Sequence, residues 1–481
     1  MHEGIYDKSA AELGRDLAAG RVSAMEAARA CLDRIAALNP RINAICTLNP
    51  EALAEAEASD RRRRAGEARG PLDGVPFVAK DNLDTRGLRT TFGSELMADY
   101  VPAEDAVCVE RLRGAGAVLL GKANTPEFAH DIRTDNLLFG PTRNPADLRR
   151  TAGGSSGGTA AAVASGMVPI CLGTDLGGSI RIPAAMCGIT GLRPSPGRVP
   201  VYPTEFGWDL LVEHVHGPIA RSAEDLGLIL AVLSGPDERD PSSLPAPTAD
   251  YAAAGRGGPG IAGRRVAYCH DFGGLLPLDP EVGELCRAAV QRFEALGCAV
   301  EEACFDASDL VAIVAGTRGF GMVGRYAHRV EAARGKMTQH LLEQVDDALK
   351  LDLKTVTEAE RLRTRYWHRV RALLERCDYI VTPAIGAPAF LLDEPLPTMV
   401  AGREVAKFYD VYRFTYAFSV VGLPVAVVPC GFTRDGLPVG LQIATRRLAD
   451  EAALEAAAAF MHACPEFVVT PSALPSAGTA A

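Results

Sequence analysis

The sequence lacks an apolar run long enough to cross a membrane, which as a helix takes about 20 residues. The nearest segment, residues 159–173, is short and is interrupted by Ser165, Gly166 and Pro169. The chain begins with charged residues and has no apolar signal core there. These absences predict a cytoplasmic protein that does not contact membranes.

Disulfide and metal-binding patterns are also missing. The 12 cysteines in 481 residues are scattered, and no two have the C-x-x-C spacing of a zinc ribbon or redox motif. We expect most of them to be buried reduced thiols. His214 and His216 lack the acidic helical partner of a zinc motif, so we expect no metal and no other cofactor.

An excess of basic residues is absent as well. The chain has 50 Lys and Arg residues against 60 Asp and Glu residues, a net charge of −10. Such an acidic balance argues against nucleic acid as a partner. A small-molecule substrate is the partner we expect.

Glycine, by contrast, is abundant: 48 of 481 residues, or about 10% against an average of roughly 7%. The excess concentrates between residues 153 and 191, where two serine-bearing clusters lie at 153–158 and 173–179. Glycines let a backbone approach a bound group and turn successive N–H groups into one space. A hydroxyl beside such N–H groups is typical of a nucleophile with an oxyanion hole.

A serine nucleophile needs a base, and none of the nine histidines lies in a catalytic pattern. Lys80 is the other candidate because it ends an apolar segment. Lowering a lysine pKa from about 10.4 to about 7 takes roughly 4 kcal/mol, which burial supplies in documented cases. A surface lysine, or an ion pair with Asp81, remains the alternative from the residues alone.

Short apolar segments alternate with helical segments from residue 71 onward. Alternation of this kind predicts an α/β fold with helices on both faces of a sheet. Strands are expected at residues 75–79, 117–120, 168–172, 265–269, 379–382, 425–429 and 439–444, and helices at 105–113, 160–165, 280–296 and 450–464. Residues 6–68 are expected to be helical, with Ser23 and Glu26 forming a capping box.

Several strings together resemble the amidase signature family. They are LDGVPFVAKDN at residues 72–82, GGSSGG at 153–158 and GTDLGGS at 173–179, continued by IRIPA. Similar segments lie at residues 121–128, 139–145, 217–222 and 437–442. The resemblance implies one structural domain, a large α/β/α unit whose mixed central sheet is covered by helices on both faces. An N-terminal helical segment (1–70) would pack on the signature domain (71–481), with its core at about 71–225, a helical insertion at about 328–376, and a monomeric or homodimeric state.

The resemblance also implies a Ser–cisSer–Lys triad that hydrolyses a carboxamide C–N bond through an acyl-enzyme. Ser179 matches the nucleophile, Ser155 the bridging serine after a cis peptide bond, and Lys80 the base. Four backbone N–H groups would hold the oxyanion, those of Leu176, Gly177, Gly178 and Ser179. Four further residues would support the two loops: Ser156, Thr174, Asp175 and Arg181.

The substrate pocket is weakly encoded. Large apolar and aromatic side chains are candidates for its wall, namely Phe92, Met97, Phe139, Phe206, Trp208, Phe320 and Tyr412. Such a wall favours a small, aryl or hydrophobic amide over a charged one. Esters and carbamates present a similar carbonyl, so esterase or urethanase activity remains open.

Two other functions remain open. Residues 153–157 also match the GxSxG nucleophile elbow of α/β-hydrolases, which would make Ser155 the nucleophile and require a downstream acid and histidine. The chain also suits the glutamine amidase component of a tRNA-dependent amidotransferase. In such proteins an Asp precedes the glycine of a GLP segment by ten residues. Here the segment begins at Gly422 and the position holds Tyr412, which weakens this interpretation.

Overall fold

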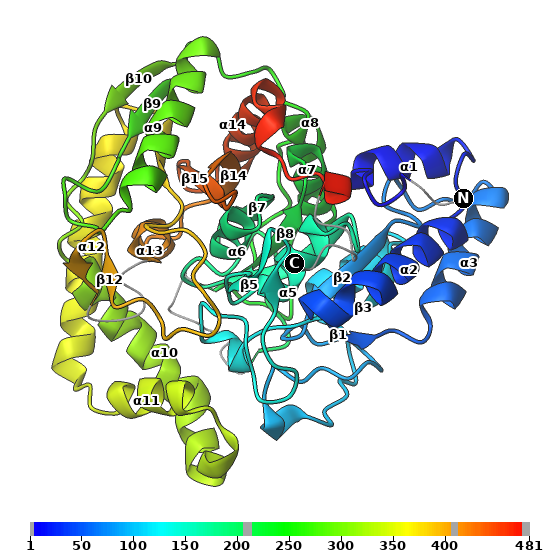
Figure 1. Ribbon diagram of the computed structural model, residues 1–481, viewed down its shortest axis with the longest axis horizontal. Coiled ribbons are helices and arrows are strands. Elements are labelled where there is room, and N and C mark those ends of the chain that lie inside the picture. Colours follow the sequence, from blue (N-terminus) through cyan, green and yellow to red (C-terminus); the bar gives the residue numbers. More distant parts are fainter. Residues whose placement is uncertain (1–3, 205–213, 406–411, 474–481) are drawn as a thin grey trace.

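The computed structural model describes residues 4–204, 214–405 and 412–473. Within these ranges, eleven strands form one sheet in the order β1-β3-β2-β6-β8-β7-β14-β15-β11-β9-β10 (Figure 1). The pairs β3–β2, β2–β6, β11–β9 and β9–β10 are parallel and the others are antiparallel. The sheet is therefore mixed, as expected. Its strands are β1 (Ile45–Leu48), β2 (Pro76–Lys80), β3 (Val118–Ala123), β6 (Ile170–Asp175), β7 (Thr190–Arg193), β8 (Val215–Ala220), β9 (Arg265–Tyr268), β10 (Ala299–Glu302), β11 (Tyr379–Pro383), β14 (Val425–Phe432) and β15 (Pro438–Ala444).

Helices cover both faces of this sheet, which confirms the expected α/β class. On one face α5 (Gly157–Ala164) and α6 (Arg181–Met186) pack together, and on the other lie α7 (Ala223–Leu233), α9 (Pro280–Ala295) and α14 (Asp450–Ala463) (Figure 1). Shorter elements complete the layers: α4 (Val107–Gly114), α8 (Tyr251–Gly255), α13 (Arg413–Ser419) and the small ribbons β4 (Arg143–Asn144) with β5 (Asp147–Thr151) and β12 (Met399–Val400) with β13 (Arg403–Glu404). In the described part of the chain, no helix has the length and apolar character of a bilayer span.

The N-terminal segment is not purely helical. It contains α1 (Ala10–Ala18), α2 (Ala24–Ile42) and α3 (Ala52–Arg64), but β1 also joins the main sheet antiparallel to β3. A strand of four residues between helices carries too little periodicity to be recognised from sequence. The predicted capping box is confirmed, since Ser23 Oγ accepts from the Glu26 N–H at 3.1 Å and the Glu26 carboxylate from the Ser23 N–H at 2.8 Å.

The helical addition begins earlier than residue 328. It comprises α10 (Leu310–Ala333), α11 (Gln339–Ala348) and α12 (Leu353–Leu374). Glycine is a poor helix former, so the glycines of α10 lower the helix propensity of this segment. The sequence therefore did not predict the first part of this helix. Packing explains them: a Cβ on Gly316 would lie 2.3 Å from Ala359 Cβ, and one on Gly319 2.1 Å from Leu351 Cδ1. These glycines let α10 approach the α12 region closely.

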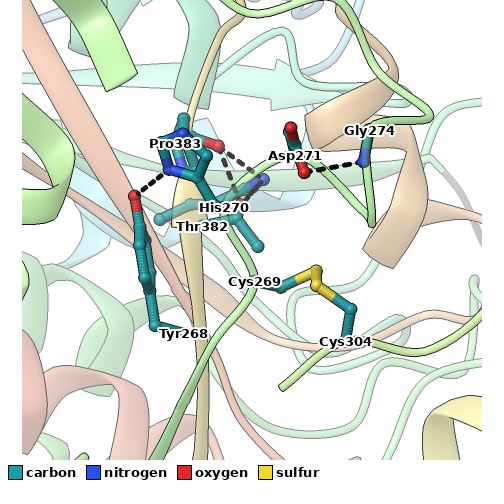
Figure 2. The surroundings of a disulfide bond; sticks show 9 residues. Tyr268, Cys269, His270, Asp271, Gly274, Cys304, Thr382 and Pro383 are labelled. Atoms are coloured by element: carbon teal, nitrogen blue, oxygen red, sulfur yellow. Dashed lines mark hydrogen bonds between the residues drawn. A yellow bond between two sulfur atoms is a disulfide. The ribbon is translucent and has the colours of Figure 1, made fainter. Parts of the chain in front are cut away.

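One pair of cysteines departs from the expectation of reduced thiols. Cys269 and Cys304 form a disulfide with Cα atoms 4.8 Å apart (Figure 2). They follow β9 and β10, which are parallel neighbours, so the sheet topology brings together two residues 35 positions apart. Ten other cysteines are free, and all but Cys46 are buried, as predicted for most of the set.

Candidate active site

Lys80 is the last residue of β2, a strand between β3 and β6 in which all five residues are buried. Its Nζ lies 2.6 Å from Ser155 Oγ and 3.0 Å from Thr174 Oγ1. Burial lowers the pKa of this amine well below its usual 10.5, although the Asp175 carboxylate opposes the shift. A neutral amine can both donate and accept a proton, so burial prepares Lys80 for base chemistry. The alternative of a surface lysine is wrong.

Ser155 lies in the turn that leads into α5. The Gly154–Ser155 peptide bond is cis, as the resemblance implies. The Ser155 carbonyl accepts from Thr125 Oγ1 at 3.1 Å, which fixes the backbone while Oγ faces Lys80. Ser155 is 1% exposed and lines the main cavity.

Ser179 lies in the loop between β6 and α6. Its carbonyl accepts from the Ser156 N–H at 3.1 Å, so the two serine loops are joined by a direct backbone hydrogen bond. Ser156 Oγ also donates to the Thr174 carbonyl at 3.2 Å. Ser179 lines the same cavity as Ser155, which brings the three residues predicted as a triad to one place.

The predicted oxyanion loop, residues 176–179, is held from outside by α13. A Cβ on Gly177 would lie 2.1 Å from Tyr416 Cζ, so only glycine fits there. Thr415 Oγ1 donates to the Gly177 carbonyl at 2.6 Å. The Gly178 N–H donates to Asp175 Oδ1 at 2.9 Å and is therefore already engaged. Leu176, Gly177 and Ser179 line the cavity and remain the candidate oxyanion donors.

Asp175 anchors this loop through buried charges. Its carboxylate accepts from Arg181 at 3.0 Å and from Arg193 at 3.2 Å, and none of the three side chains is exposed. Burial alone would raise the Asp175 pKa, but the two guanidinium groups outweigh it and hold the pKa well below the usual range. Arg181 also donates to Ser419 Oγ at 2.6 Å and to the Thr415 carbonyl at 2.8 Å, which ties the loop to α13. The four residues predicted to support the loops thus all contact them.

The two serines open on a cavity of about 680 Å³. Three of the aromatic and apolar candidates, Phe92, Met97 and Tyr412, belong to its wall. Phe139 and Phe320 are not among its described lining residues: Phe139 lies against the Arg89 guanidinium and Phe320 is 40% exposed on α10. Phe206 and Trp208 lie outside the described residues.

The cavity wall contains many side chains that the sequence did not indicate. Arg318, Arg325 and Arg329 come from α10, and His214 and His216 from the edge of β8. Aromatic and polar groups complete it, among them Asn82, Asp84, Tyr100, Phe128, His130, Asp131, Tyr202, Tyr326 and Tyr416. The one sequence signal for these three arginines would have been their spacing along α10. The glycines of α10 lower its helix propensity, so this helix was not predicted there.

The nucleophile elbow of an α/β-hydrolase is excluded. There, the GxSxG serine follows a strand of the main sheet and faces a histidine. Here the preceding strand is β5, which pairs with β4 in a separate ribbon, and Ser155 Oγ faces Lys80. The site therefore defines an α/β enzyme built on two serine loops and a buried lysine.

Comparisons of the chain with known proteins support this class of enzyme. The sequence profile of the Amidase family matches residues 26–454. The chain is 38% identical over 464 residues to an acylamidase of Rhodococcus erythropolis, covering 95% of this chain and 96% of the relative. It is 36% identical over 483 residues to one of the subunits of the glutamyl-tRNA(Gln) amidotransferase of Moorella thermoacetica, again covering 95% and 96%.

The fold agrees as well. A bacterial aryl acylamidase of the amidase signature family superposes with a TM-score of 0.90 at 30% identity, covering 97% of this chain and 99% of that one. The chain belongs to the amidase family and is an enzyme of the amidase signature fold.

Proposed function

We propose that the enzyme hydrolyses carboxamide C–N bonds by nucleophilic attack of Ser179 on the carbonyl carbon. In the first step Lys80 accepts the proton of Ser155, Ser155 accepts the proton of Ser179, and Ser179 Oγ bonds to the carbonyl carbon. The backbone N–H groups of Leu176, Gly177 and Ser179 stabilise the oxyanion. Ser155 then protonates the departing amine, and the C–N bond breaks.

The second half of the reaction releases the acid. A water molecule attacks the acyl-Ser179 ester, and its proton passes to the serine–lysine relay. Ser179 is then restored as a hydroxyl and the carboxylic acid leaves. In acylation the Ser179 proton passes to the amine and Lys80 returns its proton to Ser155, and in deacylation the water proton passes to Ser179, so the relay ends as it began.

One observation carries this proposal. Lys80 Nζ and Ser155 Oγ lie 2.6 Å apart, both are buried, and Ser155 shares a cavity with Ser179. Burial lowers the pKa of the Lys80 amine and so favours its neutral form, which a relay needs and a structural ion pair would not. The similarity to an acylamidase and an aryl acylamidase supports amides as the substrate class.

A substrate panel tests the proposal. The purified enzyme is assayed on 4-nitroacetanilide, on 4-nitrophenyl acetate and on a phenyl carbamate. Anilide turnover that Ser179→Ala abolishes without unfolding the protein is expected, and the other two substrates report esterase and urethanase activity. A fluorophosphonate probe should label Ser179, as mass spectrometry of the digest would show. Full activity in Ser179→Ala would refute the assignment.

Glutamine hydrolysis within an amidotransferase is the second candidate, favoured by the 36% identity to the Moorella thermoacetica protein. Tyr412 lines the cavity at the position where, by the resemblance, amidotransferases of that kind have an aspartate. A neutral phenol cannot pair with the ammonium group of glutamine as a carboxylate does. We therefore expect the isolated enzyme to hydrolyse anilides and to leave glutamine intact; efficient glutaminase activity would favour the second candidate.

A further inference from the structure

The disulfide lies where the backbone pairing of β9 and β10 ends. Among the described residues, the last backbone hydrogen bond between these two segments runs from the Ala303 N–H to the Tyr268 carbonyl at 3.1 Å. Cys269 and Cys304 follow directly in their chains, and their sulfurs are bonded (Figure 2). Beyond them both segments leave the sheet. The disulfide therefore continues the link between the two segments past the point where hydrogen bonding stops.

Each cysteine is followed by a phenylalanine that packs against the other one. Phe305 comes directly after Cys304 and Phe272 three residues after Cys269, and the two ring centroids are 5.3 Å apart. Phe272 has a φ of 57°, which is rare for an aromatic residue, so its surroundings must hold it in this conformation. The glycines at 273–274 that follow give the backbone wide conformational freedom. The position of Phe272 therefore depends on its packing and on the disulfide.

The two rings pack against α13. Phe272 contacts Phe414 with ring centroids 5.9 Å apart. Phe305 contacts Phe418 at 6.3 Å. Phe414 and Phe418 are fully buried and lie about one turn apart on the helix. Because protein interiors are close-packed, a shift of either partner ring must displace α13 or leave a void beside it.

The same helix holds the predicted oxyanion loop. Thr415 Oγ1 donates to the Gly177 carbonyl at 2.6 Å, and Arg181 donates to the Thr415 carbonyl at 2.8 Å. Thr415 directly follows Phe414 in a helix of seven residues, which is about two turns. A displacement at Phe414 therefore reaches Thr415 and, through it, the loop at residues 176–179.

We propose that the Cys269–Cys304 bond is a redox modification site that controls the position of the oxyanion loop. The oxidised enzyme has the higher kcat, and a low-molecular-weight thiol or dithiol lowers it by reducing the bond. The proposal rests on the proposed function, which gives the loop its part in catalysis. It assigns the disulfide an effect on the reaction in addition to its effect on stability.

Exposure determines which sulfur reacts first. Cys304 is exposed, whereas Cys269 is fully buried. The attacking thiolate therefore bonds to Cys304 Sγ, the bond to Cys269 breaks, and Cys269 leaves with the electron pair and takes up a proton. A second thiolate attacks the external sulfur of this mixed disulfide, which releases Cys304 as a thiol. Two thiols are thus oxidised to one disulfide while the protein gains two electrons and two protons.

Kinetics of the oxidised and reduced enzyme test the proposal. Wild type is assayed on 4-nitroacetanilide before and after dithiothreitol, at a temperature where circular dichroism shows both forms folded. Titration of the unfolded protein with Ellman's reagent confirms the change from ten free thiols to twelve. Reduction should lower kcat at least threefold and change KM less than twofold, because an oxyanion loop acts mainly on the transition state. Glutathione disulfide should restore kcat.

Two outcomes of this experiment would overturn the proposal. One is a smaller fall in kcat after complete reduction, which would leave the bond with an effect on stability alone. The other is twelve free thiols even after treatment with glutathione disulfide, which would show that the bond does not form.

Variants then test the route through the rings. Cys304→Ser should have the kcat of reduced wild type and should not respond to dithiothreitol; if it misfolds, reduced wild type supplies the same comparison. Phe272→Leu should lower the oxidised-to-reduced ratio of kcat at least twofold relative to Phe293→Leu. Phe293 is the matched control because its ring is equally buried but stacks on Phe460 elsewhere in the core, at 5.3 Å. Equal ratios in the two leucine variants would overturn the proposal.

Hydrogen exchange separates this proposal from the proposed function. If neither redox form hydrolyses the anilide, the proposed function fails, but amide exchange still reports on the coupling. Reduction should speed exchange at least threefold in peptides that cover α13 and residues 176–179. Peptides of α1, at the opposite end of the molecule, should stay within twofold (Figure 1). Unchanged exchange in α13 on reduction would overturn the proposal.

Discussion

Lys80 Nζ lies 2.6 Å from Ser155 Oγ, and neither side chain is more than 1% exposed. The two atoms come from segments 75 residues apart in sequence, one at the end of a central strand and one in the turn before α5. Water cannot stabilise a charge on this amine, so its protonation state is determined by the surrounding protein. Most of the predictions that follow depend on this burial or on the loop beside it.

Replacing the buried lysine should remove the base and its titration. Lys80→Met should lower kcat for an anilide by roughly a hundredfold to ten-thousandfold, the range for general base catalysis. Because the Lys80 pKa lies well below 10.5, wild-type kcat/KM should remain high far below pH 10 and fall only as acid protonates the amine. A pH–rate profile with the same acid limb in Lys80→Met would contradict this role.

The same substitution should affect stability in a pH-dependent way. Unfolding restores the usual lysine pKa, so between the folded pKa and 10.5 the unfolded chain binds more protons and the Lys80 contribution destabilises the fold. This cost is largest below the folded pKa and disappears above about pH 10.5. The melting temperature of Lys80→Met relative to wild type should therefore be higher at pH 7 than at pH 10. Lys354→Met, at an exposed position of α12, should show no such difference.

Asp175 should be essential for the fold as well as for the loop. Asp175→Ala leaves Arg181 and Arg193 buried without their counter-charge, which costs roughly 3 to 5 kcal/mol. Urea denaturation measures this loss, with Asp346→Ala at an exposed ion pair as the control. The folded-state pKa of Asp175 is depressed, so its contribution is fully present above about pH 4 and is lost as the pH falls below 4 toward the folded-state pKa. The stability of Asp175→Ala should accordingly depend less on pH below 4 than that of wild type; equal dependence would contradict the assignment.

A methyl group on the oxyanion loop should impair catalysis more than folding. In Gly177→Ala the new Cβ would lie 2.1 Å from Tyr416 Cζ, so the loop or the ring must shift. Misplacing oxyanion donors costs about a hundredfold or more in kcat. Gly114→Ala provides the control, since nothing lies within 4 Å of its added Cβ. Steady-state kinetics and melting curves of the two variants test this, and unchanged kcat in Gly177→Ala would argue against these donors.

The disulfide should stabilise the β9–β10 edge. In the chain-entropy description, closing a loop of 35 residues lowers the entropy of the unfolded chain and raises its free energy by roughly 3 to 4 kcal/mol. Cys304→Ala, or wild type in dithiothreitol, should therefore unfold at lower urea concentration. Cys46→Ala controls for loss of a thiol outside the bond. No change in midpoint on reduction would show that the bond does not form in solution.

The sequence predicted most accurately the features that depend on residues close together in the chain. The strand at residues 75–79 and the glycine–serine clusters have short-range signatures, and the structure brings Lys80, Ser155 and Ser179 together. The support of the loop by Asp175 and Arg181 followed from similarity to a known family. These features depend on backbone conformation at a few positions, which glycine and serine indicate directly.

The cavity wall could not be predicted in the same way. Phe92 and Phe139 are alike as residues, yet only Phe92 faces the cavity, because that depends on packing between distant segments. The sequence did not indicate Arg325, because the glycines of α10 lower the helix propensity of the segment in which it lies. The Cys269–Cys304 bond was missed because it depends on which strands are neighbours in the sheet.

The short helix α13 has a consequence for changing the specificity of this enzyme. Its Thr415 and Tyr416 press on Gly178 and Gly177, whereas Tyr412 at its start lines the cavity. Mutagenesis aimed at new substrates should therefore vary position 412 and leave positions 415 and 416 intact. If the proposed function holds, substrate range and reaction chemistry are encoded about one helical turn apart, and we expect directed evolution at position 412 to change the first while retaining the second.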